Sequence, residues 1–196
     1  MTQLTGRPSD YQLILPEGWF RIDLEPGTCE RAIAALVDRQ FRGADNVPQL
    51  KQESRARLLT AAQDAYHTGG VELYLSLQTA AGFPLSASLV VTLTPPHEVD
   101  QVVVTPERLA ETLAEDGQQV TLMDLSAGRA VRARRRSAPE GNPMDYQSPV
   151  TNLDIHVPVP GSSAYLLLSF STPLDPLADA LVGMFDAIAG TLRWIP

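Results

Sequence analysis

The sequence contains a single cysteine, Cys29, and a single lysine, Lys51, among its 196 residues. One cysteine excludes both an internal disulfide and a thiolate metal cluster. The chain also lacks an uninterrupted apolar run of about 18 residues, the length that a membrane-spanning helix needs, so no membrane insertion is expected. Its first ten residues lack the basic start and apolar run of a signal peptide. We therefore expect a cytoplasmic protein.

Positive charge is scarce as well, with 15 basic side chains against 23 acidic ones and a formal net charge of −8. Such a surface repels a phosphate backbone, so nucleic acid is not an expected partner. The apolar fraction of 44% and the charged fraction of 19% are typical of a globular protein. No long polar linker, repeat or low-complexity run interrupts the chain. We therefore expect residues 1–196 to form one domain.

Hydrophobic periodicity and turn residues predict pairs of strands separated by helices. The expected strands are Tyr11–Leu15, Trp19–Leu24, Val71–Leu77, Ser88–Thr94, Gln119–Leu125, Arg129–Arg136, Thr151–Val157 and Ala164–Ser171. Short connections between neighbouring strands favour antiparallel pairing and the α+β class, with helices packed on the faces of the sheet.

Four helices are expected between and after these strands. The first runs from about Cys29 to Arg42 with Thr28 as its N-cap, and the second starts at Pro48 and ends near His67. A third, short helix starts at Thr105-Pro106-Glu107. The fourth closes the chain with an apolar face formed by Leu177, Leu181, Met184, Phe185, Ile188 and Leu192. The segment Ser137–Ser148, which is rich in proline and glycine, is expected to form a mobile loop.

Few side chains suggest catalysis. Cys29 would lie in the first turn of a helix, where the dipole lowers a thiol pKa, but no histidine or second cysteine accompanies it, so we interpret it as structural. The spacing of His67, His97 and His156 matches no metal-binding motif, and neither a nucleophile elbow nor a nucleotide-binding loop occurs. We expect no metal, no cofactor and no catalytic residue. The larger aromatic residues are expected in the core: Trp19, Phe20, Phe170, Phe185 and Trp194.

An arginine cluster is the strongest local anomaly. It comprises Arg129, Arg132, Arg134, Arg135 and Arg136, which are five of the 15 basic side chains. On a strand, Arg132, Arg134 and Arg136 share one face, while Val131 and Ala133 point into the core. One interpretation is a solvated face or an edge strand whose charges discourage aggregation. The other is a patch for an acidic partner or a carboxylate ligand. The candidate partner-binding residues are Arg129, Arg132, Arg134 and Arg136.

The opening Leu15-Pro16-Glu17-Gly18-Trp19, the central hairpins, and the closing strand and helix ending in Phe185, Ile188, Leu192 and Trp194 resemble the PsbP-like family. That family includes the Mog type of Ran-binding protein and bacterial lipoproteins and secretion-associated proteins. The resemblance implies an α/β/α sandwich that acts as a binding or assembly module without catalytic residues.

On these grounds we expect a non-enzymatic accessory or chaperone-like protein that engages another protein. A genomic neighbourhood rich in bacterial secretion-system genes would favour this role. Two alternatives stay open. One is a carrier of a small apolar molecule in a groove between sheet and helix. The other is an enzyme whose site assembles from dispersed carboxylates and histidines. A homodimer is also compatible with the sequence.

Overall fold

The computed structural model describes residues 7–43, 48–80, 82–94, 98–99, 102–137 and 149–196. Its helices are α1 (Thr28–Gln40), α2 (Pro48–His67), α3 (Pro106–Glu115) and α4 (Ala178–Gly190), the last preceded by a 3₁₀ turn, η1 (Asp175–Leu177). The main sheet contains β2 (Trp19–Asp23), β3 (Gly70–Ser76), β6 (Ser88–Thr94), β9 (Gln119–Leu125), β10 (Gly128–Ser137), β11 (Val150–Pro158) and β12 (Tyr165–Thr172). Shorter pairs join β1 (Asp10–Gln12) to β13 (Arg193–Ile195), β4 (Thr79–Ala80) to β5 (Phe83–Pro84), and β7 (Glu98–Val99) to β8 (Val102–Val103).

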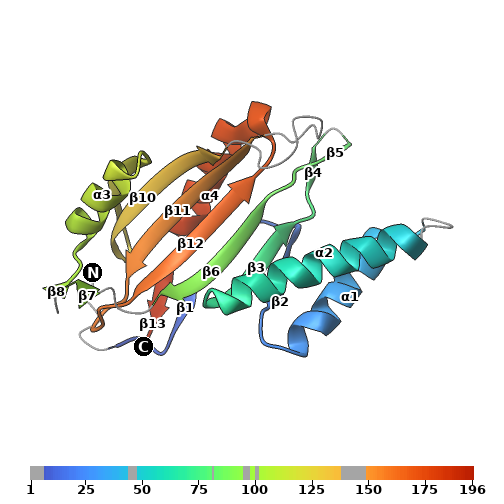
Figure 1. Cartoon of the computed structure of the whole chain (residues 1–196), viewed down its shortest axis with the longest axis horizontal. Coiled ribbons are helices and arrows are strands. Elements are labelled where there is room, and N and C mark those ends of the chain that lie inside the picture. Colours follow the sequence, from blue (N-terminus) through green and yellow to red (C-terminus); the bar gives the residue numbers. More distant parts are fainter. Residues whose placement is uncertain (1–6, 44–47, 81, 95–97, 100–101, 138–148) are drawn as a thin grey trace.

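The seven strands of the main sheet follow the order β2-β3-β6-β12-β11-β10-β9, and every neighbouring pair is antiparallel (Figure 1). The expected α+β class is therefore confirmed. Strand β12 lies at the centre and joins β6 to β11, although both of those strands precede it in the chain. Strand β10 lies between β9 and β11, so the edge strand that was offered as one interpretation of the arginine cluster is wrong for most of its length.

Helix α4 covers one side of the sheet, which we call the closed face. Phe185 and Ile188 of α4 pack into a cluster with Leu168 and Phe170 of β12, and the Phe185 and Phe170 rings stack with centroids 4.8 Å apart. Burial of such side chains is the main favourable term in folding. The expected apolar face of the closing helix is confirmed except at Leu177, which belongs to η1 and is exposed.

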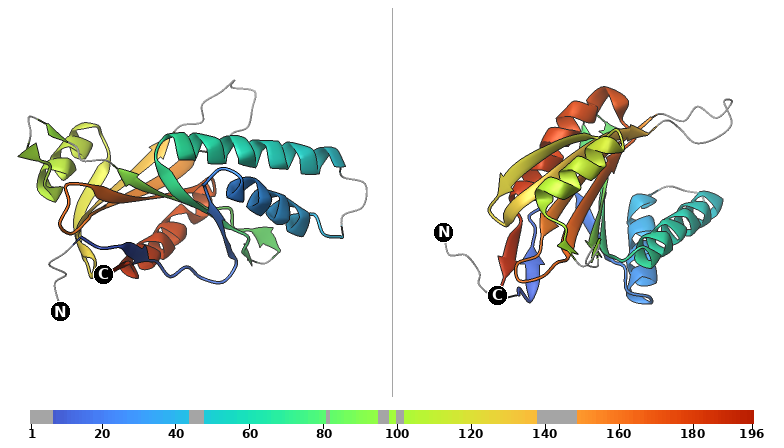
Figure 2. Two further views of the ribbon diagram at one scale, coloured as in Figure 1. Left: turned by 90° about the horizontal axis from the view of Figure 1, so that it is seen from below. Right: turned by 60° about the vertical axis from the view of Figure 1, so that its left-hand side comes forward.

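The opposite side, which we call the open face, carries helices only at its two ends. Figure 2 shows α2 and α3 on the side of the sheet opposite α4. Helices α1 and α2 pack against β2 and β3 through a second apolar cluster, and α3 packs against β9 and β10. In Figure 1, β11, β12 and β6 lie between α3 and α2 without a described helix over them on this side.

Strand β11 shows the difference between the two faces, because its apolar side chains point to one face and its polar side chains to the other. Leu153 and Ile155 point to the closed face and are fully buried. Asn152, Asp154 and His156 alternate with them, point to the open face and stay partly exposed. Because successive side chains of a strand point to opposite faces, the strand has one apolar side and one polar side.

The ends of the described chain meet in the β1–β13 ribbon. Asp10 pairs with Ile195, and the Ser9 hydroxyl donates a 2.7 Å hydrogen bond to the carbonyl oxygen of Pro196. The indole N–H of Trp194 donates to the carbonyl oxygen of Ala127 over 2.8 Å, which satisfies the polar atom of this partly buried side chain. Strand β13 was not expected, because the sequence analysis assigned Trp194 only to the end of the closing helix.

Most helix ends agree with the sequence analysis. Helix α2 has the expected bounds, and Thr105 caps α3 by accepting the backbone N–H of Arg108 over 3.3 Å. Thr28, by contrast, is the first residue of α1, and the capping position is occupied by Gly27, which forms no side-chain cap. The expected loop Ser137–Ser148 lies outside the described residues except for Ser137. Among the described helices, none combines the length and the apolar character needed to span a membrane.

Candidate functional site

The arginines of β10 that share one face point to the closed face, where they meet a row of aspartates from α4 and η1. Arg132 donates to both carboxylate oxygens of Asp186, at 2.8 and 3.1 Å. Two more pairs continue the row, which we call the arginine ladder: Arg134 with Asp179 at 2.7 Å, and Arg136 with Asp175 at 2.8 Å.

The spacing of both partners explains the ladder. Alternate residues of β10 lie on one face. Asp179 and Asp186 are seven residues apart, which is about two helical turns, so they lie on one side of α4. Asp175 lies four residues earlier, in η1. The arginines were predicted from the sequence, whereas these aspartates were not, although their spacing along the closing helix indicates a common side.

Arg129, the fourth candidate partner-binding residue, lies apart from the ladder. Its side chain points to the open face and forms an ion pair with Glu107 of α3 at 3.2 Å. Each candidate arginine therefore has an acidic neighbour within the chain. Arg132 is the least exposed, with 19% of its side chain accessible. Arg129 and Arg136 remain more than half exposed.

The end of β10 lines a polar hollow of about 660 Å³, which we call the arginine hollow. The pairing of β9 with β10 begins at Gln119 opposite Arg134, so Arg135 and Arg136 extend beyond it without a strand partner on that side. The turn between α3 and β9 forms the rest of the wall. The lining residues are Asp116, Gly117, Gln118, Gln119, Arg134, Arg135 and Arg136.

Arg135 differs from its neighbours in direction and pairing. It points to the open face, opposite to the arginine ladder, and its side chain is 54% exposed. Its nearest acid is Asp154, and the two charged groups are 4.0 Å apart, at the limit of an ion pair. A guanidinium has five N–H donors in a planar fork, which suits a second carboxylate. Arg135 was part of the predicted cluster but not among the four candidate binding residues.

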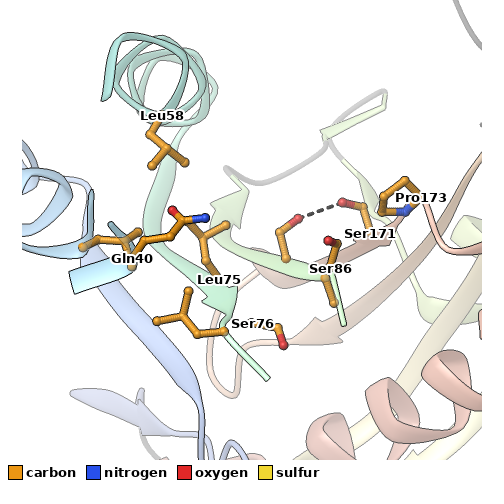
Figure 3. Close-up of a pocket in the computed structure, with 11 residues that line it drawn as sticks. Gln40, Leu58, Leu75, Ser76, Ser86, Ser171 and Pro173 are labelled. Atoms are coloured by element: carbon orange, nitrogen blue, oxygen red, sulfur yellow. Dashed lines mark hydrogen bonds between the residues drawn. The ribbon is translucent and has the colours of Figure 1, made fainter. Parts of the chain in front are cut away.

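A second hollow, of about 290 Å³, lies on the open face where the α1–α2 pair meets the sheet (Figure 3). In the close-up, Leu58 and Gln40 approach from the helices, and Leu75 points toward them from β3. The floor carries hydroxyl groups, and those of Ser88 and Ser171 are joined by a 2.7 Å hydrogen bond. We call this the serine hollow, because one wall is apolar and Ser76, Ser86, Ser88 and Ser171 line the other.

The open face also brings together the residues on which the enzyme alternative depends. Asp154 and His156 lie two residues apart on β11, and Ser169 of β12 lies opposite Asp154. The Ser169 hydroxyl donates a hydrogen bond directly to the Asp154 carboxylate. Activation of a serine nucleophile uses a base that takes the hydroxyl proton, usually an imidazole oriented by a carboxylate. Among the described residues, no three histidine, cysteine or acidic side chains are grouped to hold a metal ion.

Cys29 is buried near the start of α1 and lines a small hollow between α1 and α2 together with His67. Burial raises the pKa of its thiol, and the nearby charges of Glu30 and Asp23 raise it further. These effects oppose the helix dipole, which would favour the thiolate. The structural interpretation of Cys29 agrees with this environment, because a raised pKa disfavours the reactive form.

A polar cluster around Glu72 connects the ribbon to the sheet. The Glu72 carboxylate accepts hydrogen bonds from the Tyr11 hydroxyl at 2.6 Å and the Tyr74 hydroxyl at 2.7 Å, and also from Arg21. Burial raises the pKa of both tyrosine hydroxyls well above the ordinary value, and the hydrogen bond to Glu72 raises it further. The cluster holds β1 against β3 and was not anticipated from the sequence.

No protein-family model matches the sequence, and no curated protein matches it. A solved structure that matches is the solution structure of cyanobacterial PsbP (CyanoP) from Synechocystis sp. PCC 6803, with a TM-score of 0.44 and 14% sequence identity. The match covers 94% of this chain and 86% of that chain. This match is a similarity in the course of the backbone alone.

Proposed function

We propose that this protein is a non-enzymatic binding or assembly module, and that an acidic segment of another protein binds in the arginine hollow. The observation that supports this best is that three consecutive arginines, Arg134 to Arg136, line one hollow of a chain with a net charge of −8. Arginine is the side chain best suited to bidentate recognition of carboxylates. The cytoplasmic location expected from the sequence stays a prediction.

Two of the three arginines retain capacity for a partner. The bond from Arg136 to Asp175 uses one N–H of a side chain that is more than half exposed. Arg135 lies 4.0 Å from its acid, and a closer carboxylate would compete for it. Arg134 is less available because it also holds α4 through Asp179. We therefore assign partner binding to Arg135 and Arg136 first, and assign Arg132 and Arg134 mainly to the attachment of α4.

Charge reversal at these two positions tests the proposal. The variant Arg135→Glu/Arg136→Glu and the matched control Arg55→Glu/Arg57→Glu, on the exposed surface of α2, serve as bait in affinity capture from the native host. Partners that bind wild type and control at low salt, but not the hollow variant, support the proposal. Their binding should weaken as salt rises, because opposed charges are screened. Identical partners for all three baits would overturn it.

A second candidate function is carriage of a small apolar ligand, which a third hollow of about 310 Å³ favours. This hollow lies beside the ribbon, and Val71 and Leu93, which are 41% and 46% exposed, line it with Leu166 and Trp194. Exposed apolar groups that line one concave surface are typical of a ligand site. Titration with the fluorescent probe anilinonaphthalene sulfonate, with wild type and Val71→Glu, tests it. Equal fluorescence of both proteins would exclude this hollow as the site.

A further inference from the structure

The arginine hollow and the serine hollow are connected by a single row of side chains across the open face. The strand register places Arg135 opposite Asn152, Asn152 opposite Ser171, Ser171 opposite Ser88, and Ser88 opposite Leu75. We call these five residues the cross-strand row. It starts at a cation in the arginine hollow, passes an amide and two hydroxyls, and ends at a leucine in the serine hollow.

The row spans five neighbouring strands. Strands are spaced by about 4.8 Å, so Arg135 and Leu75 lie at positions about 19 Å apart. An extended peptide advances about 3.3 Å per residue and covers that distance in about six residues. The row therefore has the length of a short linear segment that crosses the strands, from the turn after α3 at one end to the α1–α2 pair at the other (Figure 1).

The side chains of the row change in character from charged, through polar, to apolar. At the first end, Arg135 is the exposed cation, and its acid neighbour Asp154 is 4.0 Å away. In the middle, the Asn152 amide donates to Ser137 over 3.2 Å, and the paired hydroxyls of Ser88 and Ser171 retain acceptor lone pairs. At the far end, three leucines form the apolar wall of the serine hollow: Leu36, Leu58 and Leu75.

From this order we infer that the partner of the arginine hollow is an extended protein segment with a carboxylate at one end and an apolar side chain about six residues away. The carboxylate binds Arg135, the backbone of the segment hydrogen-bonds to Asn152 and the two serines, and the apolar side chain enters the serine hollow. The inference rests on the proposed function and specifies its partner. A hollow of about 290 Å³ has room for one apolar side chain.

Synthetic peptides test the inference directly. The probes carry two glutamates at one end and a leucine at the other, separated by glycine–serine spacers of two, four or eight residues, and each is made in both chain directions. A control peptide has serine in place of leucine. Binding is followed at low salt by the shifts of the side-chain amide signals of Asn152 and Gln40 in NMR spectra. The four-residue spacer should bind at least fivefold more tightly than the two-residue spacer and than the peptide without leucine.

Two variants and their controls distinguish the contributions of the two ends of the row to peptide binding. Arg135→Gln should weaken the binding of every acidic peptide, whereas Arg57→Gln, on α2, should not. Gln40→Glu places a charge at the mouth of the serine hollow and should weaken the binding of the leucine peptides only. Gln52→Glu, at another exposed glutamine, should not change binding. Both test positions are exposed, so the variants should fold.

The outcomes distinguish the inference from the proposed function. If no acidic peptide binds, or if Arg135→Gln changes nothing, both are overturned. If acidic peptides bind through Arg135 but respond neither to the leucine and its spacing nor to Gln40→Glu, the proposed function stands and the cross-strand row is overturned. Leucine-dependent binding that Gln40→Glu abolishes and Gln52→Glu preserves supports both.

Discussion

The guanidinium of Arg132 holds both carboxylate oxygens of Asp186 and thereby fixes helix α4 against strand β10. Such a bidentate pair combines two charge-assisted hydrogen bonds in one plane, which makes its geometry specific. With 19% of Arg132 and 33% of Asp186 exposed, the pair is better shielded from solvent than the Arg136–Asp175 pair. The arginine ladder is therefore graded, strongest in the middle of α4 and weakest at η1.

A double-mutant cycle measures this gradient. Arg132→Ala and Asp186→Ala, alone and combined, should give a coupling energy of about 1 kcal/mol or more, because the pair is bidentate and partly buried. The same cycle at Arg136 and Asp175 should give less than about 0.5 kcal/mol, as is common for exposed pairs. Urea unfolding monitored by circular dichroism provides the free energies. Equal coupling at the two sites would contradict the gradient.

Removal of the Phe185 ring tests the closed face. The side chain is fully buried and stacks on Phe170, so Phe185→Ala leaves a cavity. We expect a loss of about 3–5 kcal/mol in the free energy of unfolding, from lost transfer energy and the cavity. The urea midpoint should fall with an unchanged slope, since the fold is retained. A loss below about 1 kcal/mol would show that α4 does not close the core.

Two glycines form a matched pair for a test of backbone packing. At Gly70, the first residue of β3, an added Cβ would lie 2.6 Å from the backbone carbonyl oxygen of Ala65 in α2. Gly70→Ala must displace α2 and should cost about 1–3 kcal/mol. At Gly183, on the exposed side of α4, an added Cβ meets nothing within 4 Å, and Gly183→Ala should stabilise by about 0.5–1 kcal/mol. Thermal melts that rank the variants in the opposite order would refute this packing.

The cluster around Glu72 predicts a dependence of stability on alkaline pH. The pKa of Tyr11 and Tyr74 is raised in the folded state, so the folded protein keeps protons that the unfolded chain loses above about pH 10, the ordinary tyrosine pKa. The unfolded state then binds fewer protons, and stability falls as the pH rises further. The stability gap between wild type and Tyr11→Phe should narrow between pH 9 and about 11. Tyr66→Phe, at an exposed tyrosine, is the control. If the stability gap between wild type and this control narrows equally, the assignment to Tyr11 is contradicted.

The elements that the sequence predicted well are those with strong local signals. The bounds of α2 followed from Pro48 at its start and the glycine pair after His67, and the β9–β10 hairpin followed from Ser126-Ala127-Gly128 at its turn. These signals are turn chemistry and periodicity, which act within a few residues. Thr28 failed as a cap because Gly27 can adopt a positive φ, here 85°, and occupies the capping position instead.

The candidate site was harder to predict from the sequence, because its residues are brought together by the order of the strands in the sheet rather than by their spacing in the sequence. Arg135 and Ser88 share one row only because β12 inserts between β6 and β11, and no local pattern in the sequence encodes that insertion. The same limit explains why an edge strand was one of the interpretations of the arginine cluster. Its neighbour β9 was expected, but the position of the pair beside β11 depends on contacts between distant segments.

The central position of β12 also has a consequence for the order in which the chain can fold. Leu168 pairs with Val91 on one side and Ile155 on the other, so β6 and β11 each keep an unpaired edge until β12 has been synthesised. Partners this distant in sequence slow folding, because loop closure precedes the stabilising contacts. A nascent chain on the ribosome therefore exposes two aggregation-prone strand edges until Thr172 emerges, and chaperone binding during translation should be strongest over that interval.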